Sequence, residues 1–317
     1  DLLDEPSKHH LIMGLFAAVS VISAYAAVTQ GYITDDILEA SRVGGFAAGS
    51  NDAARYFVVA MVFVTYLRSQ VRHLFLRFFM LSAIIITYLG VFYTASRSGM
   101  VLLFFAQMLL FFFQHEGKQR IQYLVIFGLA FSLIALLADP ILGILSNILP
   151  AITEGTDTMG LRYDLWEAGW YMWLDHPVSG VGVGMFRQSV PSYMLRIPGA
   201  VPRRLVAHNI YVTILTETGI IGFILFMSAL NASLKNYINA RHYLDSDQMD
   251  ERNVWLIVFL VMLLGGMTKT DQVDKLLWMV MGISVYYANL SYAAEQALEK
   301  TDKKLKNFRN RRFVRRY

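Results

Sequence analysis

The sequence predicts an all-α integral membrane protein, a polytopic bundle of about eight membrane-spanning helices with one long, ordered non-cytoplasmic loop. Hydrophobic residues make up 56% of the 317 residues, charged residues only 16%, and the mean hydropathy is +0.43. Because soluble domains carry about 25% charged residues, the surplus of apolar side chains must face lipid. The apolar residues also form continuous runs rather than alternating with polar ones, which favours helices over a β-barrel. Disordered, fibrous, coiled-coil and ordinary soluble proteins are excluded.

Eight apolar runs approach the length of about 20 residues that a helix needs to cross a bilayer core of about 30 Å. The expected spans lie near residues 11–28, 54–67, 78–95, 98–113, 121–138, 209–230, 253–268 and 276–294. The runs near 54–67 and 253–268 are short, so they need flanking residues or a thinner bilayer. The chain starts at Asp1 and shows no cleavable signal peptide, and we expect more helices upstream in the full-length protein.

The distribution of Lys and Arg predicts how the bundle is oriented. With the first segment inside, 18 of the 28 basic residues lie in residues 1–10, 68–77, 114–120, 231–253 and 295–317. Positive residues concentrate in cytoplasmic connections, so both termini are expected in the cytoplasm and residues 139–208 on the other side. The basic tail, residues 295–317, is typical of a juxtamembrane anchor on anionic membrane lipids. We therefore expect no nucleic-acid partner despite the net charge of +4.

The loop of residues 139–208 is long enough to be functional, and its aromatic content predicts an ordered fold. Within it, residues 161–175 read as an interfacial helix that Pro177 terminates. Helical spacing places Arg162 and Trp166 on one face with two further tryptophans. Such a face either lies at the membrane–water interface or packs on the end of the bundle. In both cases Arg162 lies among aromatic rings at the depth of a lipid phosphate.

Two further patterns flank this helix. The glycine-rich segment Ser179–Met185 follows a helix rather than a strand, so it predicts a tight return loop, with N–H groups facing an anion, and not a nucleotide site. The span from residue 209 carries Asn209, Thr213 and Glu217 on one polar stripe. Glu217 is expected to face a wet cavity, a cationic partner or a neighbouring helix.

Acid–base chemistry has one candidate at the outer surface, His208, at the start of the same span. The chain has no cysteine, and no cluster of His, Asp and Glu has metal-ligand spacing. We therefore expect no metal and no cofactor.

Four segments form an ordered set of motifs: RVGGFAAGSNDAA from Arg42, SRSG from Ser96, GLRYDLWEAGWYMWLDHPVSGVGVGMF from Gly160, and HNIYVTILTETGIIG from His208. Together they resemble the O-antigen ligase and polymerase superfamily of bacterial envelope glycosyltransferases. The pattern near Arg42 often contains Asp-Pro-Asn, where this chain has Gly49, Ser50 and Asn51.

The resemblance implies a metal-independent, inverting glycosyltransferase of lipopolysaccharide or surface polysaccharide biosynthesis. Its donor would be an undecaprenyl-diphosphate-linked glycan, its acceptor lipid A–core or another glycan, and its location the bacterial inner membrane with a periplasmic active site. Residue by residue, the motifs imply catalytic roles for Arg97, Arg162 and His208. Substrate-binding roles are expected for Arg42, Asn209, Glu217 and Trp166.

The acceptor stays open, because the motifs are shared by ligases, repeat-unit polymerases and protein O-oligosaccharyltransferases. A more remote alternative is a transporter of lipid-linked glycans. Transporters tend to place charges near the bilayer midplane, whereas the polar candidates here lie near the outer rim.

Overall fold

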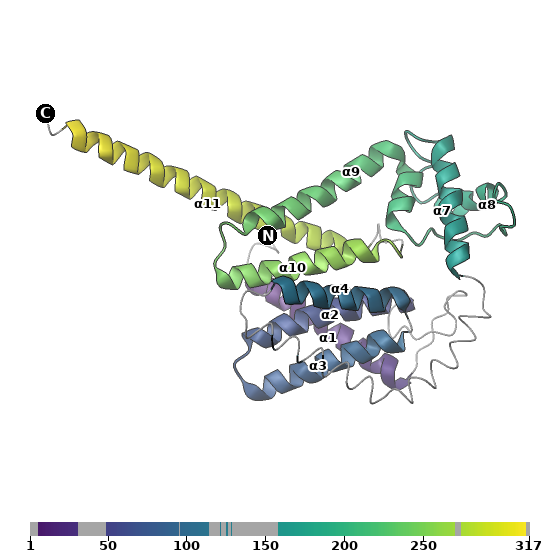
Figure 1. Cartoon of the computed structure of the whole chain (residues 1–317), viewed down its shortest axis with the longest axis horizontal. Coiled ribbons are helices and arrows are strands. Elements are labelled where there is room, and N and C mark those ends of the chain that lie inside the picture. The colour runs from purple at the N-terminus through teal and green to yellow at the C-terminus, as the bar shows by residue number, and fades with distance from the viewer. Residues whose placement is uncertain are drawn as a thin grey trace.

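A computed structural model describes residues 6–30, 49–94, 96–113, 121, 125, 128, 158–269 and 274–314. Regular secondary structure in these residues is entirely α-helical (Figure 1). The helices are α1 (Pro6–Gln30), α2 (Ser50–Gln70), α3 (Leu74–Tyr93), α4 (Arg97–Phe113), α7 (Thr158–Asp175), α8 (Phe186–Met194), α9 (Ile210–Ala240), α10 (Ser246–Gly265) and α11 (Lys275–Val314).

Helices occupy every expected span except that near 121–138, most of which lies outside the described residues. The helices extend further than the apolar runs: α2 begins at Ser50, and α11 continues through the basic tail to Val314. Three described helices are long and apolar enough to cross a membrane, namely Ser7–Thr29, Leu74–Tyr93 and Ile210–Ala240, and the shorter Arg97–Phe113 is also apolar. The described residues are therefore helical in their regular structure and include long apolar helices, as expected of an integral membrane protein, and the count of eight spans stays a prediction.

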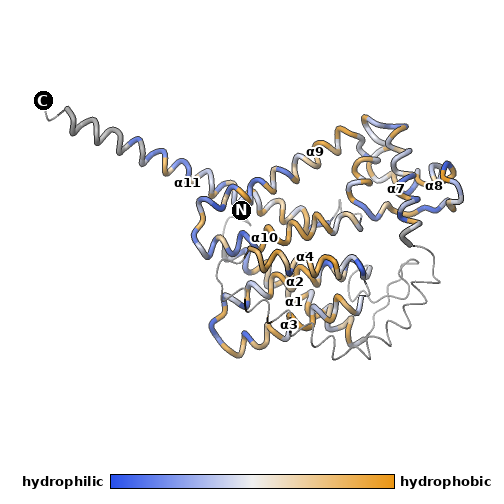
Figure 2. Tube along the Cα trace, in the orientation of Figure 1, coloured by the Kyte–Doolittle hydropathy of each residue, from blue (hydrophilic) through white to orange (hydrophobic). Residues whose placement is uncertain are grey.

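The centre of the bundle is formed by α2 and α10, which pack against each other and against α4. Every residue of α2 from Phe57 to Tyr66 is buried, and so is nearly all of α10 from Glu251 to Met262. The outer helices instead expose apolar side chains, as α1 does with Leu11, Leu15, Val19 and Ile22. Figure 2 shows these apolar stretches along α1, α3, α4 and α9. Their exposed faces are suited to lipid.

At one end of the bundle α7 and α8 form a small helical module against the start of α9 (Figure 1). A second hydrophobic cluster holds this module together, with Leu165, Ala168 and Met172 of α7 against Phe186 and Val190 of α8. Of the tryptophan stripe, Trp166 packs against this cluster. Within that stripe Trp166 is half-buried, whereas Trp170 is 51% exposed.

The module is closed by a surface ion pair between its helix ends. Arg196, just after α8, donates to Asp175 at the end of α7 at 2.7 Å. This hydrogen bond lowers the pKa of the Asp175 carboxyl below its ordinary value.

The helix α9 is interrupted at Gly219, where the backbone leaves the helical conformation (φ 65°, ψ −167°). The glycine-rich loop that follows α7 fills the break. Its Val181 and Gly182 N–H groups donate to the carbonyl oxygens of Thr216 and Glu217 at 2.9 and 3.0 Å. On the other side of the break, Ile220 N–H donates to Pro177 O at 2.8 Å. The loop thus satisfies the backbone groups that the interrupted helix leaves open.

Replacing Gly219 with Ala should detach the glycine-rich loop from α9. A Cβ atom would overlap the backbone carbonyl of Val178, and the φ value lies in the left-handed region. We expect the free energy of unfolding to fall by about 3 kcal/mol or more, measured as a lower melting temperature of the purified protein in detergent. The matched control is Gly184→Ala, which has a similar φ of 77° but open space around the Cβ position. Equal losses in the two variants would show that the close approach at Gly219 is unimportant.

Candidate functional site

A pocket of about 480 Å³ lies where the module meets the end of the bundle. Residues from five separate segments line it: Asn51, Arg97, Ser98, Val101, Leu102, Arg162, Trp166, Asn209, Leu264, Met267 and Thr268. Four of the residues selected from sequence, Arg97, Arg162, Trp166 and Asn209, therefore share one cavity. Two guanidinium groups face it and none of these described lining residues is acidic, so the pocket is suited to an anion.

The start of α4 fixes Arg97 at the edge of this pocket. The Ser96 hydroxyl accepts a hydrogen bond from Gly99 N–H at 3.0 Å, so Ser96 caps the helix. The same hydroxyl donates to Oδ1 of Asn51 in α2 at 2.6 Å. At Gly99 the helices approach so closely that a Cβ atom would overlap that of Ala54. The SRSG motif is therefore a helix cap and a tight helix contact that together present an exposed arginine.

Trp166 connects α7 to the segment that enters α9. Its indole N–H donates to the carbonyl oxygen of Ala207 at 2.8 Å. The next residue, His208, has a left-handed backbone with φ 47°. His208 does not line the pocket but directly precedes Asn209, which does. The backbone that leads into His208 is held by the hydrogen bond from α7.

Asn209 has a structural role in addition to its place in the pocket. Its side-chain oxygen accepts from Tyr211 N–H and Val212 N–H, so Asn209 caps α9. Ile210 N–H donates to Gly266 O at 2.8 Å, and the Tyr211 hydroxyl donates to Leu263 O at 2.8 Å. These bonds attach the start of α9 to the end of α10. Asn209, which lines the pocket, is thus held in place by its cap on α9 and by the bonds between α9 and α10.

A buried ionic network lies next to the pocket and was not expected from sequence. Arg55 of α2 donates to Asp52 at 3.2 Å and to Asp274 at 2.8 Å, and Lys269 pairs with Asp52. Tyr56 adds a hydrogen bond to Asp274 at 3.1 Å. The structure buries Arg55 inside α2, where it joins that helix to Asp274 at the start of α11.

Glu217 does not face the pocket, and among the described residues no cation pairs with it. Its carboxylate accepts from Gly184 N–H at 2.9 Å and from Phe186 N–H at 3.1 Å. The glycine-rich loop does turn N–H groups towards an anion, as expected, but that anion is the protein's own side chain. Glu217 is 4% exposed, and its two hydrogen bonds hold the loop on α9.

Arg42 and Thr213, which the sequence analysis also selected, are not among the described residues that line the pocket. Arg42 lies outside the described residues. Thr213 is buried and donates to Asn209 O at 2.8 Å inside α9. Within the part of the chain that the structure describes, no group of three or more His, Asp or Glu side chains could hold a metal ion.

Residues 81–227 match a family model described as O-antigen ligase. Over this stretch the chain is similar to the O-antigen ligase family. The resemblance seen in the sequence motifs is confirmed, and the match includes Arg97, Arg162, Trp166, His208, Asn209 and Glu217. No curated protein matches the chain at a significant level.

Changing Glu217 to Gln should destabilise the loop rather than act on substrate binding alone. A Gln side chain has one oxygen acceptor, so its NH₂ group would face a backbone N–H. Hydrogen bonds to a charged acceptor contribute about 1.5–3 kcal/mol, and we expect a clearly lower melting temperature and faster proteolysis near residues 177–186. Glu167→Gln, on the exposed side of α7, is the control and should change neither. A higher KM with unchanged unfolding and proteolysis would assign Glu217 to the substrate instead.

Proposed function

We propose that this protein is an inverting membrane glycosyltransferase that moves a glycan from an undecaprenyl-diphosphate carrier to an acceptor hydroxyl. The observation that carries the proposal is the pocket that joins Arg97 of α4, Arg162 of α7 and Asn209 of α9. These residues are far apart in sequence, and all lie inside the stretch matched by the O-antigen ligase family. The family similarity supports the proposed reaction class, and the pocket supports the proposed location of the site.

The chemistry of the donor explains the need for two arginines. As the bond between sugar C1 and the phosphate oxygen breaks, the electron pair stays with the diphosphate, which gains negative charge. Guanidinium groups donate forked hydrogen bonds to phosphate oxygens, and stabilising charge that develops in the transition state is a large part of catalysis. Arg97 and Arg162 can supply the positive charge that other glycosyltransferases take from a divalent cation.

The second half of the reaction needs a base. The acceptor oxygen forms the new bond to C1 on the face opposite to the leaving diphosphate, and its proton goes to the base. His208 is the candidate, since it adjoins the pocket wall and is partly exposed. Asn209 can orient the acceptor with its amide N–H₂ group, because its carbonyl oxygen is already used to cap α9. Trp166 offers an aromatic face to a sugar ring.

The orientation in the membrane is part of the proposal. Both termini would be cytoplasmic and the pocket periplasmic, in the inner membrane, as the distribution of Lys and Arg favours. The acceptor would be lipid A–core or another glycan, and a protein Ser or Thr is the alternative within the same superfamily. Incubation of purified full-length protein with lipid-linked oligosaccharide and EDTA, with or without lipid A–core, separates these cases. Product on lipid A–core identifies a ligase, and longer lipid-linked chains without added acceptor identify a polymerase.

Removal of either pocket arginine should abolish most transfer. For Arg97→Ala and Arg162→Ala we expect kcat to fall about 10²–10³-fold, as for the loss of one group that stabilises transition-state charge. The Lys variants should recover only part of the rate, because Lys lacks the forked geometry. Arg187→Ala, on exposed α8 and away from the pocket, is the control. Near-normal transfer by a correctly inserted Arg162→Ala protein would refute the diphosphate assignment.

The role of His208 is testable through the pH dependence of transfer. His208→Asn suits the test because Asn tolerates the left-handed backbone at this position. We expect kcat to fall about 10²–10⁴-fold and the acidic limb of the pH–rate profile to disappear. His176→Asn, exposed after α7, should keep the wild-type profile. An unchanged profile in His208→Asn would remove the proposed base.

A further inference from the structure

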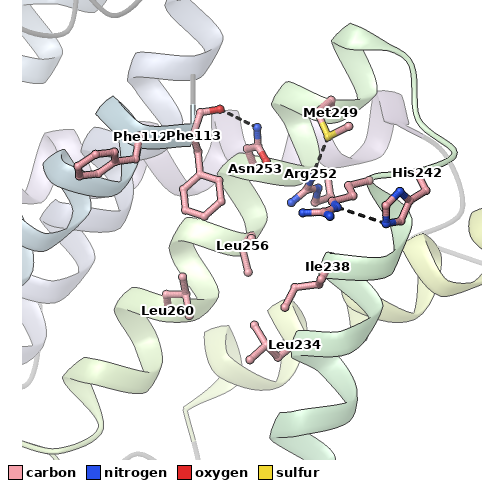
Figure 3. Close-up of a pocket in the computed structure, with 11 residues that line it drawn as sticks. Phe112, Phe113, Leu234, Ile238, His242, Met249, Arg252, Asn253, Leu256 and Leu260 are labelled. Carbon is pink, nitrogen blue, oxygen red and sulfur yellow. Dashed lines mark hydrogen bonds between the residues drawn. The ribbon is translucent and has the colours of Figure 1, made fainter. Parts of the chain in front are cut away.

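A second pocket, of about 570 Å³, lies at the opposite end of the same helices (Figure 3). Its walls are the C-terminal end of α4, the C-terminal part of α9 and the N-terminal part of α10. The active-site pocket uses the other ends of α4 and α10. Since α4 has 17 residues, its ends lie about 25 Å apart, close to the thickness of the hydrocarbon core. The two pockets therefore suit the two opposite surfaces of the membrane.

Three basic side chains line this second pocket: Arg241, His242 and Arg252. Arg252 is only 4% exposed, and none of the described lining residues is acidic. Its Nη2 donates to the sulfur of Met249 at 2.8 Å, and its Nε has no hydrogen-bond partner among the described residues. A buried guanidinium normally has a carboxylate or another anion beside it.

The nearest carboxylate in sequence does not serve Arg252. Glu251 instead bonds to His9 of α1 at 2.5 Å and accepts from the Tyr287 hydroxyl of α11 at 3.3 Å. The charge of Arg252 therefore stays available for a ligand. The exposed Arg241, whose Nε donates to His242 at 3.3 Å, adds a second positive charge at the rim.

A polar acceptor lies next to Arg252. The side-chain nitrogen of Asn253 donates to Phe113 O at 2.9 Å, at the end of α4, while its oxygen is buried with no hydrogen-bond partner among the described residues. Among the described residues, the pocket thus combines cations that no carboxylate pairs with and an acceptor that no donor uses. That combination fits a phosphate whose substituent carries a hydroxyl group.

The rest of the pocket is apolar and extends along the helices away from the charges. Leu256 and Leu260 follow Arg252 at intervals of four residues on α10, so they share its face. Leu234 and Ile238 of α9 lie opposite them (Figure 3). A cationic end beside an apolar groove at membrane depth matches a lipid headgroup with its acyl chain.

We propose that this pocket binds one anionic glycerophospholipid of the phosphatidylglycerol type. Arg252 and Arg241 hold the phosphodiester, a headgroup hydroxyl donates to Asn253 Oδ1, and an acyl chain lies against Leu256 and Ile238. Free phosphate offers the same anion chemistry but leaves the apolar wall uncovered. The site is independent of the proposed transferase reaction, because no residue of the active-site pocket takes part in it.

Native mass spectrometry of the full-length protein in detergent tests this directly. With phosphatidylglycerol we expect one lipid retained per chain, and with phosphatidylcholine none at the same concentration. Arg252→Gln should weaken retention about tenfold or more, since one pair of charge-assisted bonds is lost. Lys235→Gln is the matched control: it removes one charge from the exposed face of the same end of α9, outside the pocket, and should retain the lipid.

A further variant separates the lipid from other anions and protects the test against misfolding of Arg252→Gln. Ile238→Trp fills the apolar groove without changing any charge, and it should also reduce retention of phosphatidylglycerol. Inorganic phosphate at millimolar concentration should not raise the melting temperature as the lipid does. Equal retention of both lipids, equal weakening by Lys235→Gln, full retention by Ile238→Trp or stabilisation by phosphate alone would each overturn the proposal.

Discussion

The arrangement of the candidate site depends on one buried carboxylate. Glu217 accepts two backbone N–H groups from the glycine-rich loop, and the same loop takes over the backbone hydrogen bonds that α9 loses at Gly219. A charge at that depth is tolerated because the N–H groups compensate for its lost hydration. This contact, together with the hydrogen bond from Trp166 to Ala207 O, fixes the helical module of α7 and α8 to the start of α9. Both attachments keep Arg162 and Trp166 at the pocket.

The sequence was a better guide to which polar residues lie together than to the role of each one. Arg97, Arg162, Trp166 and Asn209 were selected from motifs and topology, and the structure brings them to one cavity. Motifs succeed here because segments far apart in sequence meet at one end of the helix bundle. The helices could be predicted equally well, because a long apolar segment has few other conformations open to it in a bilayer.

The errors have physical reasons that lie in tertiary contacts. A lone acid in an apolar run suggests a cavity, and only the folded loop shows that backbone N–H groups reach Glu217 instead. Asp52 and Arg55 are three positions apart, but their network depends on Asp274, which is 219 positions from Arg55, so no local pattern reveals it. The same holds for Arg252, which looks like an ordinary topology determinant until its burial is known.

The contact between Gly99 and Ala54 leaves no room for even one methyl group. Glycine and alanine are the two smallest residues. A larger residue at either position therefore has no space, unless Ala54 becomes Gly when Gly99 becomes Ala. The separation of α2 and α4 is therefore set by their backbones rather than by deformable side chains. Because Arg97 is two positions before Gly99, the position of its backbone relative to α2 is determined by this backbone contact, and a change at one of the two positions requires a compensating change at the other.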